Sequence, residues 1–144
     1  RYGRVLVSWD AFERVDFSNG GSGPSYGDFH PGQRLAGTVT TNDGRKLTGR
    51  LVYDLDESET TEMLDGERRD LSYSIPFALV AAVVPRGESS RVILLSGEEL
   101  VLEESTDVSD DNAGVLVFES GRKEPTYVPW DDVARVAFAA PKER

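Results

Sequence analysis

The acidic segment 107–114 has the residue types and spacing best suited to hold a metal ion. Asp107, Ser109 and Asp111 alternate along it, and oxygen ligands on alternating loop residues suit calcium. The glycine of this segment, however, comes two residues later than in the usual calcium loop, and no glutamate follows at the usual bidentate position. Aspartate and asparagine also form turns by bonding to their own backbone. Two interpretations remain, a calcium site with these three ligands and an ion-free turn.

A second group of carboxylates follows a predicted strand. Paired carboxylates can bind a metal or act as general acid and base, although such a run is more often a solvated loop. His30 is the sole histidine of the chain and would have to serve any Ser-His-Asp triad, but no nucleophile-elbow sequence accompanies it. We therefore expect no catalytic residues and no enzyme, and we rank a hydrolase with paired carboxylates third. The carboxylates are Asp54, Asp56, Glu57 and Glu59.

Charge and composition limit the classes of partner that the chain is expected to bind. The chain has 144 residues, 26 acidic against 16 basic, and a net charge of −10. This charge would repel a phosphate backbone, so we expect no nucleic-acid partner. The longest apolar stretch, residues 77–84, is far short of the ~20 residues of a spanning helix, so we expect no membrane insertion. The sequence contains no cysteine, which excludes disulfides and thiolate chemistry.

An internal repeat organises the elements that would position these groups. An aliphatic residue, a small residue or proline, and an aromatic recur around Trp9, Phe77 and Trp130. The second and third copies are 53 residues apart, and the first and third are 121 apart. Each copy predicts a strand, a one-turn helix and a final strand, with alternating apolar positions that suit one buried face. We interpret the three aromatics as equivalent core residues.

Glycines mark the turns upstream of the two later copies. Gly44 follows Asp43, and Gly97 follows a serine. Each predicts a hairpin with a positive-φ residue in its turn. Counted in this way, each unit holds about five strands in roughly fifty residues, the inventory of a small closed barrel.

The predicted fold is therefore all-β, with two tandem five-stranded barrels at 36–87 and 89–139. Residues 1–17 are interpreted as the terminal strand pair of a truncated preceding unit. Residues 18–35 begin as a Gly/Ser-rich linker, and its aromatics Tyr26 and Phe29 are expected to dock on a neighbouring barrel. The two barrels are also compatible with one continuous sheet.

Some of these residues resemble known barrels. The run from Asp43-Gly44 through Gly49 to Asp54 resembles the first motif of Sm-like proteins. The Ile75-Pro76 and Val128-Pro129 endings resemble the last strands of Src-homology (SH3) barrels. The pattern from residue 37 to 138 is similar to uncharacterised repeat proteins of bacterial envelopes. That resemblance implies an SH3/Sm-like fold and a periplasmic or extracellular, envelope-associated location.

The resemblance implies no established activity, because the binding residues differ. Sm-like proteins bind RNA through a loop asparagine and a later Arg-Gly pair, whereas the loop here is Leu-Asp-Glu-Ser-Glu at 55–59. Tyr53, Tyr73 and Phe77 supply only part of the aromatic ladder of an SH3 peptide groove. The leading prediction is a non-enzymatic protein-interaction or scaffold module of an exported bacterial protein, with a protein partner or other subunits contacted through Tyr26, Phe29, Tyr53 and Tyr73. The alternative is a calcium- or small-ligand-binding module using segment 107–114, and no other cofactor is expected.

Overall fold

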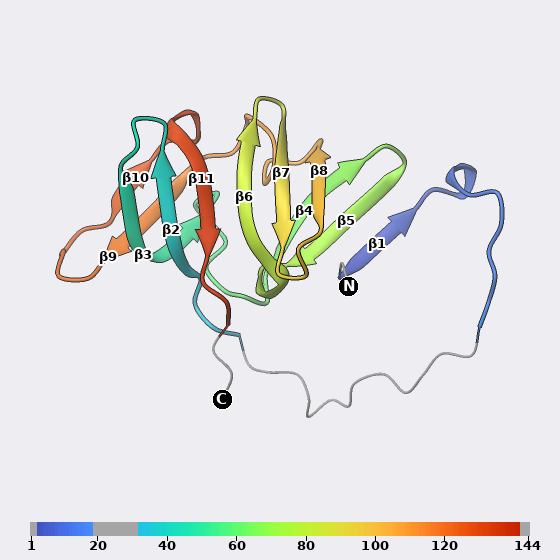
Figure 1. The fold of residues 1–144 in the computed structure, drawn as a ribbon, viewed down its shortest axis with the longest axis horizontal. Coiled ribbons are helices and arrows are strands. Elements are labelled where there is room, and N and C mark those ends of the chain that lie inside the picture. Colours follow the sequence, from blue (N-terminus) through green and yellow to red (C-terminus); the bar gives the residue numbers. More distant parts are fainter. Residues whose placement is uncertain (1–2, 19–31, 142–144) are drawn as a thin grey trace.

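The computed structural model describes residues 3–18 and 32–141, and this part of the chain is all-β (Figure 1). Eleven antiparallel strands form one unclosed sheet, and the only helices among the described residues are single 3-10 turns. None of these helices is long and apolar enough to cross a membrane. The elements are β1 (Arg4–Val7), η1 (Trp9–Ala11), β2 (Ala36–Thr41), β3 (Lys46–Tyr53), β4 (Met63–Arg68), β5 (Leu71–Pro76), η3 (Phe77–Leu79), β6 (Val80–Arg86), β7 (Ser89–Leu94), β8 (Glu99–Glu103), β9 (Val115–Glu119), β10 (Thr126–Val128), η4 (Trp130–Asp132) and β11 (Val133–Phe138).

The strands form where apolar residues alternate with polar ones. In β8, Leu100 and Leu102 are buried, while Glu99, Val101 and Glu103 between and beside them are exposed. Successive side chains of a strand point to opposite faces, so this period of two buries one face and leaves the other in water. The predicted strand character of these segments follows from that pattern.

The sheet does not keep the strands of the two predicted units apart. Its order is β1-β5-β4-β8-β7-β6-β11-β2-β3-β9-β10. Strand β3 pairs with β9, and β4 pairs with β8. Strand β2 pairs with β11, and β6 pairs with β7. Each half of the sheet therefore combines strands from residues 36–87 with strands from residues 89–139.

Four pairs of corresponding elements of the two halves begin 53 residues apart, namely β2 and β7, β3 and β8, η3 and η4, and β6 and β11. Strands β2 and β7 begin at 36 and 89, and the turns η3 and η4 begin at 77 and 130. Each pairing that crosses between the units has its counterpart, because β2–β11 corresponds to β7–β6 and β3–β9 to β8–β4. At the centre of the sheet β6 pairs with β11, and Val83 lies opposite Val136. The two crossing connections are residues 54–62 and 104–114.

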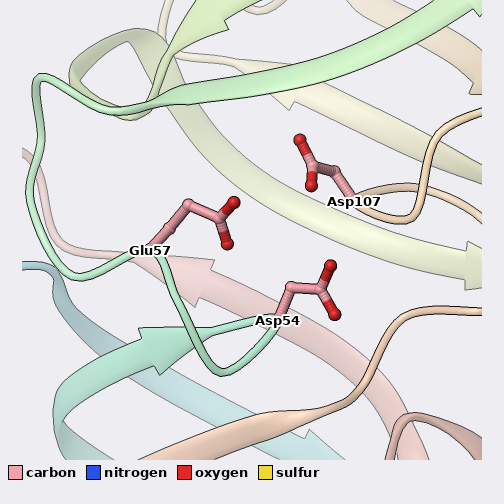
Figure 2. A group of neighbouring side chains, drawn as sticks. All are labelled: Asp54, Glu57 and Asp107. Atoms are coloured by element: carbon pink, nitrogen blue, oxygen red, sulfur yellow. The ribbon is translucent and has the colours of Figure 1, made fainter.

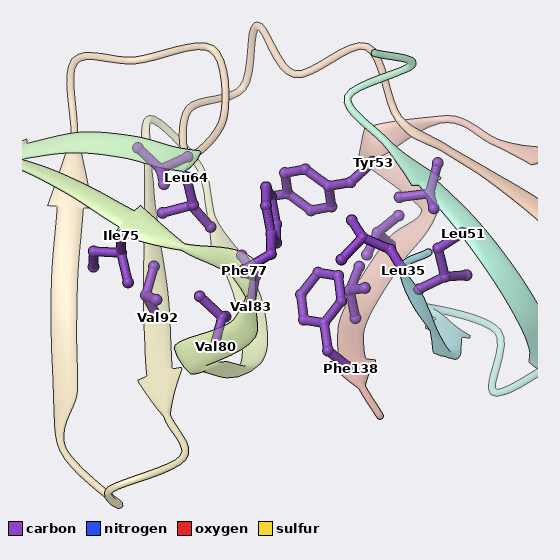
Figure 3. Packing of buried hydrophobic residues seen from close by; sticks show 14 of the residues in the cluster. Leu35, Leu51, Tyr53, Leu64, Ile75, Phe77, Val80, Val83, Val92 and Phe138 are labelled. Carbon is purple, nitrogen blue, oxygen red and sulfur yellow. The ribbon is translucent and has the colours of Figure 1, made fainter. Parts of the chain in front are cut away.

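A single hydrophobic core spans both halves, and Tyr53 lies at its centre (Figure 3). The Tyr53 ring makes edge contacts with Phe77 and Trp130, at centroid distances of 5.4 and 5.6 Å. Phe77 is 2% exposed and Trp130 is 5% exposed, so both are core aromatics. Trp9 is 82% exposed. The interpretation of Trp9 as an equivalent core residue is therefore wrong. Within residues 3–18 the elements are β1 and η1, and they leave its ring in solvent.

The N-terminal segment adds an edge strand. Strand β1 pairs with β5 from Arg4 opposite Ser74 to Val7 opposite Leu71. It is the only strand within residues 3–18, where a strand pair was predicted. At the other end of the chain, the Ala139 N–H donates to the Ala36 carbonyl at 2.7 Å, so β2 begins beside the point where β11 ends.

The predicted structural glycines have different roles. Gly44 and Gly97 have φ angles of +86° and +88° in their hairpin turns, the region that glycine enters most easily. Gly49 lies inside β3, where a Cβ would be 2.2 Å from the Phe118 carbonyl oxygen of β9. It is therefore required by the close approach of two backbones.

Because the strands are interleaved, we expect a chain cut between β6 and β7 to remain assembled. Residues 1–87 and 88–144, produced together with an affinity tag on one piece only, should co-purify as a one-to-one complex. The ladders β2–β11, β3–β9, β4–β8 and β6–β7 join the two pieces. Its circular dichroism spectrum should match that of the uncut chain. Recovery of the tagged piece alone and folded would contradict the interleaved pairing.

Candidate cation-binding site

Three carboxylates converge between the two crossing connections (Figure 2). Asp54 and Glu57 follow β3, and Asp107 follows β8. One oxygen of each carboxylate lies within 4.8 Å of the others. Asp54 and Asp107 are 53 positions apart in the sequence, which is the spacing of the corresponding strands.

The backbone of the first connection turns sharply to present two of these side chains. Asp54 and Leu55 have φ angles of +48° and +66°, a left-handed conformation that turns the chain back at the end of β3. The Glu57 N–H then donates to the Tyr53 carbonyl at 3.0 Å. On the other side, the Asp54 carboxylate accepts a hydrogen bond from the Ala113 N–H. This turn places Glu57 beside Asp54 rather than in solvent.

Asp107 is held by hydrogen bonds from β3, from β4 and from its own connection. Its Oδ2 accepts the Asp65 N–H at 2.6 Å. Its carbonyl accepts the Tyr53 hydroxyl at 2.5 Å and the Asn112 Nδ2 at 3.3 Å. Asp107 is also buried, at 6% exposed. The carboxylate is therefore fixed in place by the core.

Burial sets the electrostatics of the site. It is the main cause that raises the pKa of Glu57 to about 9, followed by a hydrogen bond with Asp56 and the charge of Asp107. It also raises the pKa of Asp107 to about 6 and raises that of Asp54. Glu57 Oε2 is buried and has no hydrogen-bond partner. No ion pair between described residues joins any of the three to Lys or Arg.

The three carboxylates can share one cation. Two oxygens bound to the same ion lie at most two bond lengths apart, which is about 4.8 Å for calcium and about 4.2 Å for magnesium. The oxygens here fall within the calcium limit. Zinc favours nitrogen and sulfur ligands, which the three residues do not offer.

The structure separates the residues predicted as calcium ligands. Asp107 points into the carboxylate cluster, but Ser109 and Asp111 line an open hollow of about 360 Å³ with other acidic residues. The Asp111 N–H donates to Ser109 Oγ at 3.4 Å, so this part of the segment forms a self-bonded turn. Of the predicted set, Asp107 alone lies in the carboxylate cluster. The 53-residue spacing from Asp54 was the signal that could have identified its partner.

The other predicted residues divide between the core and the surface. Tyr53 is fully buried in the core, so it is not a surface contact for a partner. Tyr73 is 8% exposed and lines an open hollow of about 280 Å³ beside β5. Asp56 is exposed and Glu59 is half-buried outside the cluster. Tyr26, Phe29 and His30 lie outside the described residues.

Comparisons with known proteins found no family to which the chain can be assigned. Neither a protein-family model, nor a curated protein, nor a solved structure matches the chain. What can be concluded about the site comes from its own residues.

The raised pKa values predict an unusual pH dependence of stability without metal. The pKa values of Glu57 and Asp107 are 4.5 and 3.8 in the unfolded chain and about 9 and about 6 in the folded chain. At a pH between the two values of a residue, the folded chain therefore keeps a proton on it that the unfolded chain has released. The stabilising effect of these protons is complete below the unfolded values and is lost as the pH rises toward about 9 and about 6. In EDTA, the thermal unfolding midpoint should therefore fall between pH 6 and pH 9. Glu57→Gln should flatten that fall, and an unchanged slope in this variant would contradict the assignment to Glu57.

Proposed function

We propose that the chain is a non-enzymatic structural module that binds calcium through Asp54, Glu57 and Asp107. The observation that carries the proposal is the buried Glu57 Oε2, which lacks a partner while its carboxylate faces two others. A buried charge without a partner is costly. A proton or a cation must therefore neutralise the cluster, and a cation would satisfy all three carboxylates at once.

The connections that supply the ligands give this binding a structural role. Residues 54–62 and 104–114 carry the chain between the two halves of the sheet. An ion shared by Asp54, Glu57 and Asp107 would tie these crossings together. Calcium modules outside cells bind with dissociation constants of about 10⁻⁴ to 10⁻³ M, which suits the envelope location predicted from the sequence.

An acid-base hydrolase has less support from the same residues. Glu57 and Asp107 titrate at different pH, as an acid and a base would. However, neither Glu57 nor Asp107 lines any of the four surface hollows of about 280, 360, 180 and 230 Å³. The Glu57 Oε2 atom is itself buried.

Calcium titration of matched variants tests the proposal. We expect millimolar calcium to raise the unfolding midpoint of the wild-type chain and to release protons at pH 7.5, measured by calorimetry in two buffers. Asp107→Asn and Glu57→Gln should abolish both effects. Asp111→Asn, which removes the same charge from the neighbouring hollow, should retain them.

Two results would reject the calcium site. One is the absence of any shift in the wild-type chain at millimolar calcium. The other is a response lost in Asp111→Asn but kept in Asp107→Asn, which would return the ligands to segment 107–114 as first predicted.

The proposed fold is a pair of five-stranded SH3/Sm-like units that exchange strands. One unit would contain β2, β3, β9, β10 and β11, and the other β4 to β8. In each, the strand that follows the one-turn helix pairs with the strand that begins a repeat, as β11 does with β2 and β6 with β7. The common spacing of 53 residues supports two copies of one β unit that have exchanged strands with each other.

A further inference from the structure

We propose that residues 12–17 pair antiparallel with the same residues of a second copy of the chain, with Val15 of one copy opposite Val15 of the other. The segment follows η1, and none of its residues belongs to the hydrophobic core. No backbone hydrogen bond joins it to another described part of the chain. Figure 1 shows it leaving the sheet beyond β1.

The sequence of this segment is that of a strand which is buried elsewhere in the same chain. Residues 128–138 hold the last residue of β10, η4 and β11. At a spacing of 121, residues 7–17 match them at six of eleven positions. Residues 12–17 therefore correspond to β11. The matching residues are Val7, Trp9, Asp10, Arg14, Val15 and Phe17.

The equivalent apolar side chains have opposite environments. In β11, Val136 is fully buried and Phe138 is 9% exposed. Their counterparts Val15 and Phe17 are 49% and 95% exposed. Exposed apolar residues gathered in one short segment mark an interaction site. The pattern that buries a strand in the core is therefore left without a partner in the N-terminal segment.

The sheet shows which partner a strand of this type takes. At its centre β6 and β11, the strands that follow the one-turn helices, pair antiparallel with each other. Val83 lies opposite Val136, which is its equivalent 53 residues later. Ala82 lies opposite Ala137, so one residue before the first valine meets one residue after the second. The register is therefore symmetric about two equivalent positions.

The N-terminal segment already makes one junction of this kind. Strand β1 pairs antiparallel with β5, and Val5 lies opposite Tyr73. These two residues are again equivalent, because both correspond to Thr126, at spacings of 121 and 53. Strands at equivalent positions of the repeat thus pair with each other about a local two-fold axis at both junctions.

Residues 12–17 find no free strand of their own type within the described part of the chain. Strand β6 pairs with β7 and β11, and β11 pairs with β2 and β6, so both edges of each are occupied. The same residues of a second copy are a free strand of that type. Pairing with them would repeat the β6–β11 junction between two chains, in an isologous interface.

The register taken from the β6–β11 junction also matches opposite charges. With the two Val15 residues opposite each other, Arg14 of each copy lies opposite Asp16 of the other. Opposite charges across an antiparallel pair stabilise it, and like charges destabilise it. Both side chains are exposed, and within one chain they already lie 2.7 Å apart. A parallel arrangement would instead place Arg14 opposite Arg14, so the charges select the antiparallel one.

Charge reversal in the full chain tests the pairing. Sedimentation equilibrium in EDTA, which keeps the calcium site out of the result, should show a weak monomer–dimer equilibrium of the wild-type chain at millimolar protein. Arg14→Asp and Asp16→Arg should each weaken self-association about tenfold. An equimolar mixture of these two variants should associate as the wild type does, because every aspartate then meets an arginine.

The matched controls change the net charge by the same amount at exposed residues outside the segment. Lys123→Glu and Glu124→Arg should leave self-association almost unchanged. The proposal is overturned if the wild-type chain stays monomeric at millimolar protein. It is also overturned if the mixture of Arg14→Asp and Asp16→Arg associates no more strongly than either variant alone.

Cysteine cross-linking tests the register, since the chain contains no cysteine of its own. Val15→Cys places two thiols directly opposite each other across the two-fold axis, within the reach of a disulfide. Glu13→Cys is the control, because residue 13 lies opposite Phe17 of the second copy. With oxidised glutathione, Val15→Cys should form a covalent dimer about tenfold faster than Glu13→Cys. Equal rates would contradict the proposed pairing.

Discussion

Tyr53→Leu should lower the free energy of unfolding by about 2–4 kcal/mol, somewhat less than when a large buried aromatic is cut back to alanine. Its ring is fully buried against Phe77, Trp130 and Phe138. These residues come from η3, η4 and β11, so the loss would affect both halves of the sheet together. Urea denaturation followed by circular dichroism measures it, and a single cooperative transition is expected at lower urea.

The matched control is Tyr53→Phe, which retains the ring and removes only the hydroxyl. That hydroxyl donates to the Asp107 carbonyl at 2.5 Å, and the buried acceptor would keep its Asn112 bond. We expect a loss of about 1 kcal/mol, well below that of Tyr53→Leu. Equal losses in the two variants would show that the hydrogen bond, and not the aromatic packing, stabilises this part of the core.

Gly49→Ala should be strongly destabilising although it adds only one methyl group. A Cβ at this position would lie 2.2 Å from the Phe118 carbonyl oxygen and 2.7 Å from its carbon. Because the obstacle is backbone, β3 and β9 must move apart where Gly49 lies opposite Glu119. We expect a loss of about 3 kcal/mol, the upper range for overpacking, measured by thermal and urea unfolding.

Gly44→Ala separates this steric effect from the backbone freedom of glycine. Gly44 has a φ of +86° and open space around its Cα. Alanine there should cost about 1 kcal/mol from conformational strain alone. If Gly49→Ala costs no more than Gly44→Ala, then β3 and β9 are not held as closely as the pairing indicates.

The sequence predicted the strands and turns well because their signals are local. Alternation in segments such as β8, and the glycines at 44 and 97, depend on neighbouring residues only. The choice of pairing partner does not. The edge of β3 offers the same backbone groups to β4 as to β9, and corresponding strands have similar alternations of apolar and polar residues. Periodicity therefore cannot distinguish pairing within a unit from pairing between units.

The candidate site was predicted only in part for a related reason. Asp107 was selected with Ser109 and Asp111 because ligand spacing was counted along one loop. Its neighbours in space come from the other crossing connection, where the positive φ angles of Asp54 and Leu55 fold the chain back. Because these two residues are not glycines, their residue types gave no indication of the positive φ angles.

The hydrogen bond between Ala139 and Ala36 has a practical consequence. It places the first and last residues of the segment 36–139 side by side. This segment could therefore be inserted as a domain into a surface loop of another protein. Grafted in that way, it would add its carboxylate cluster to a host without separating the two sides of the host loop.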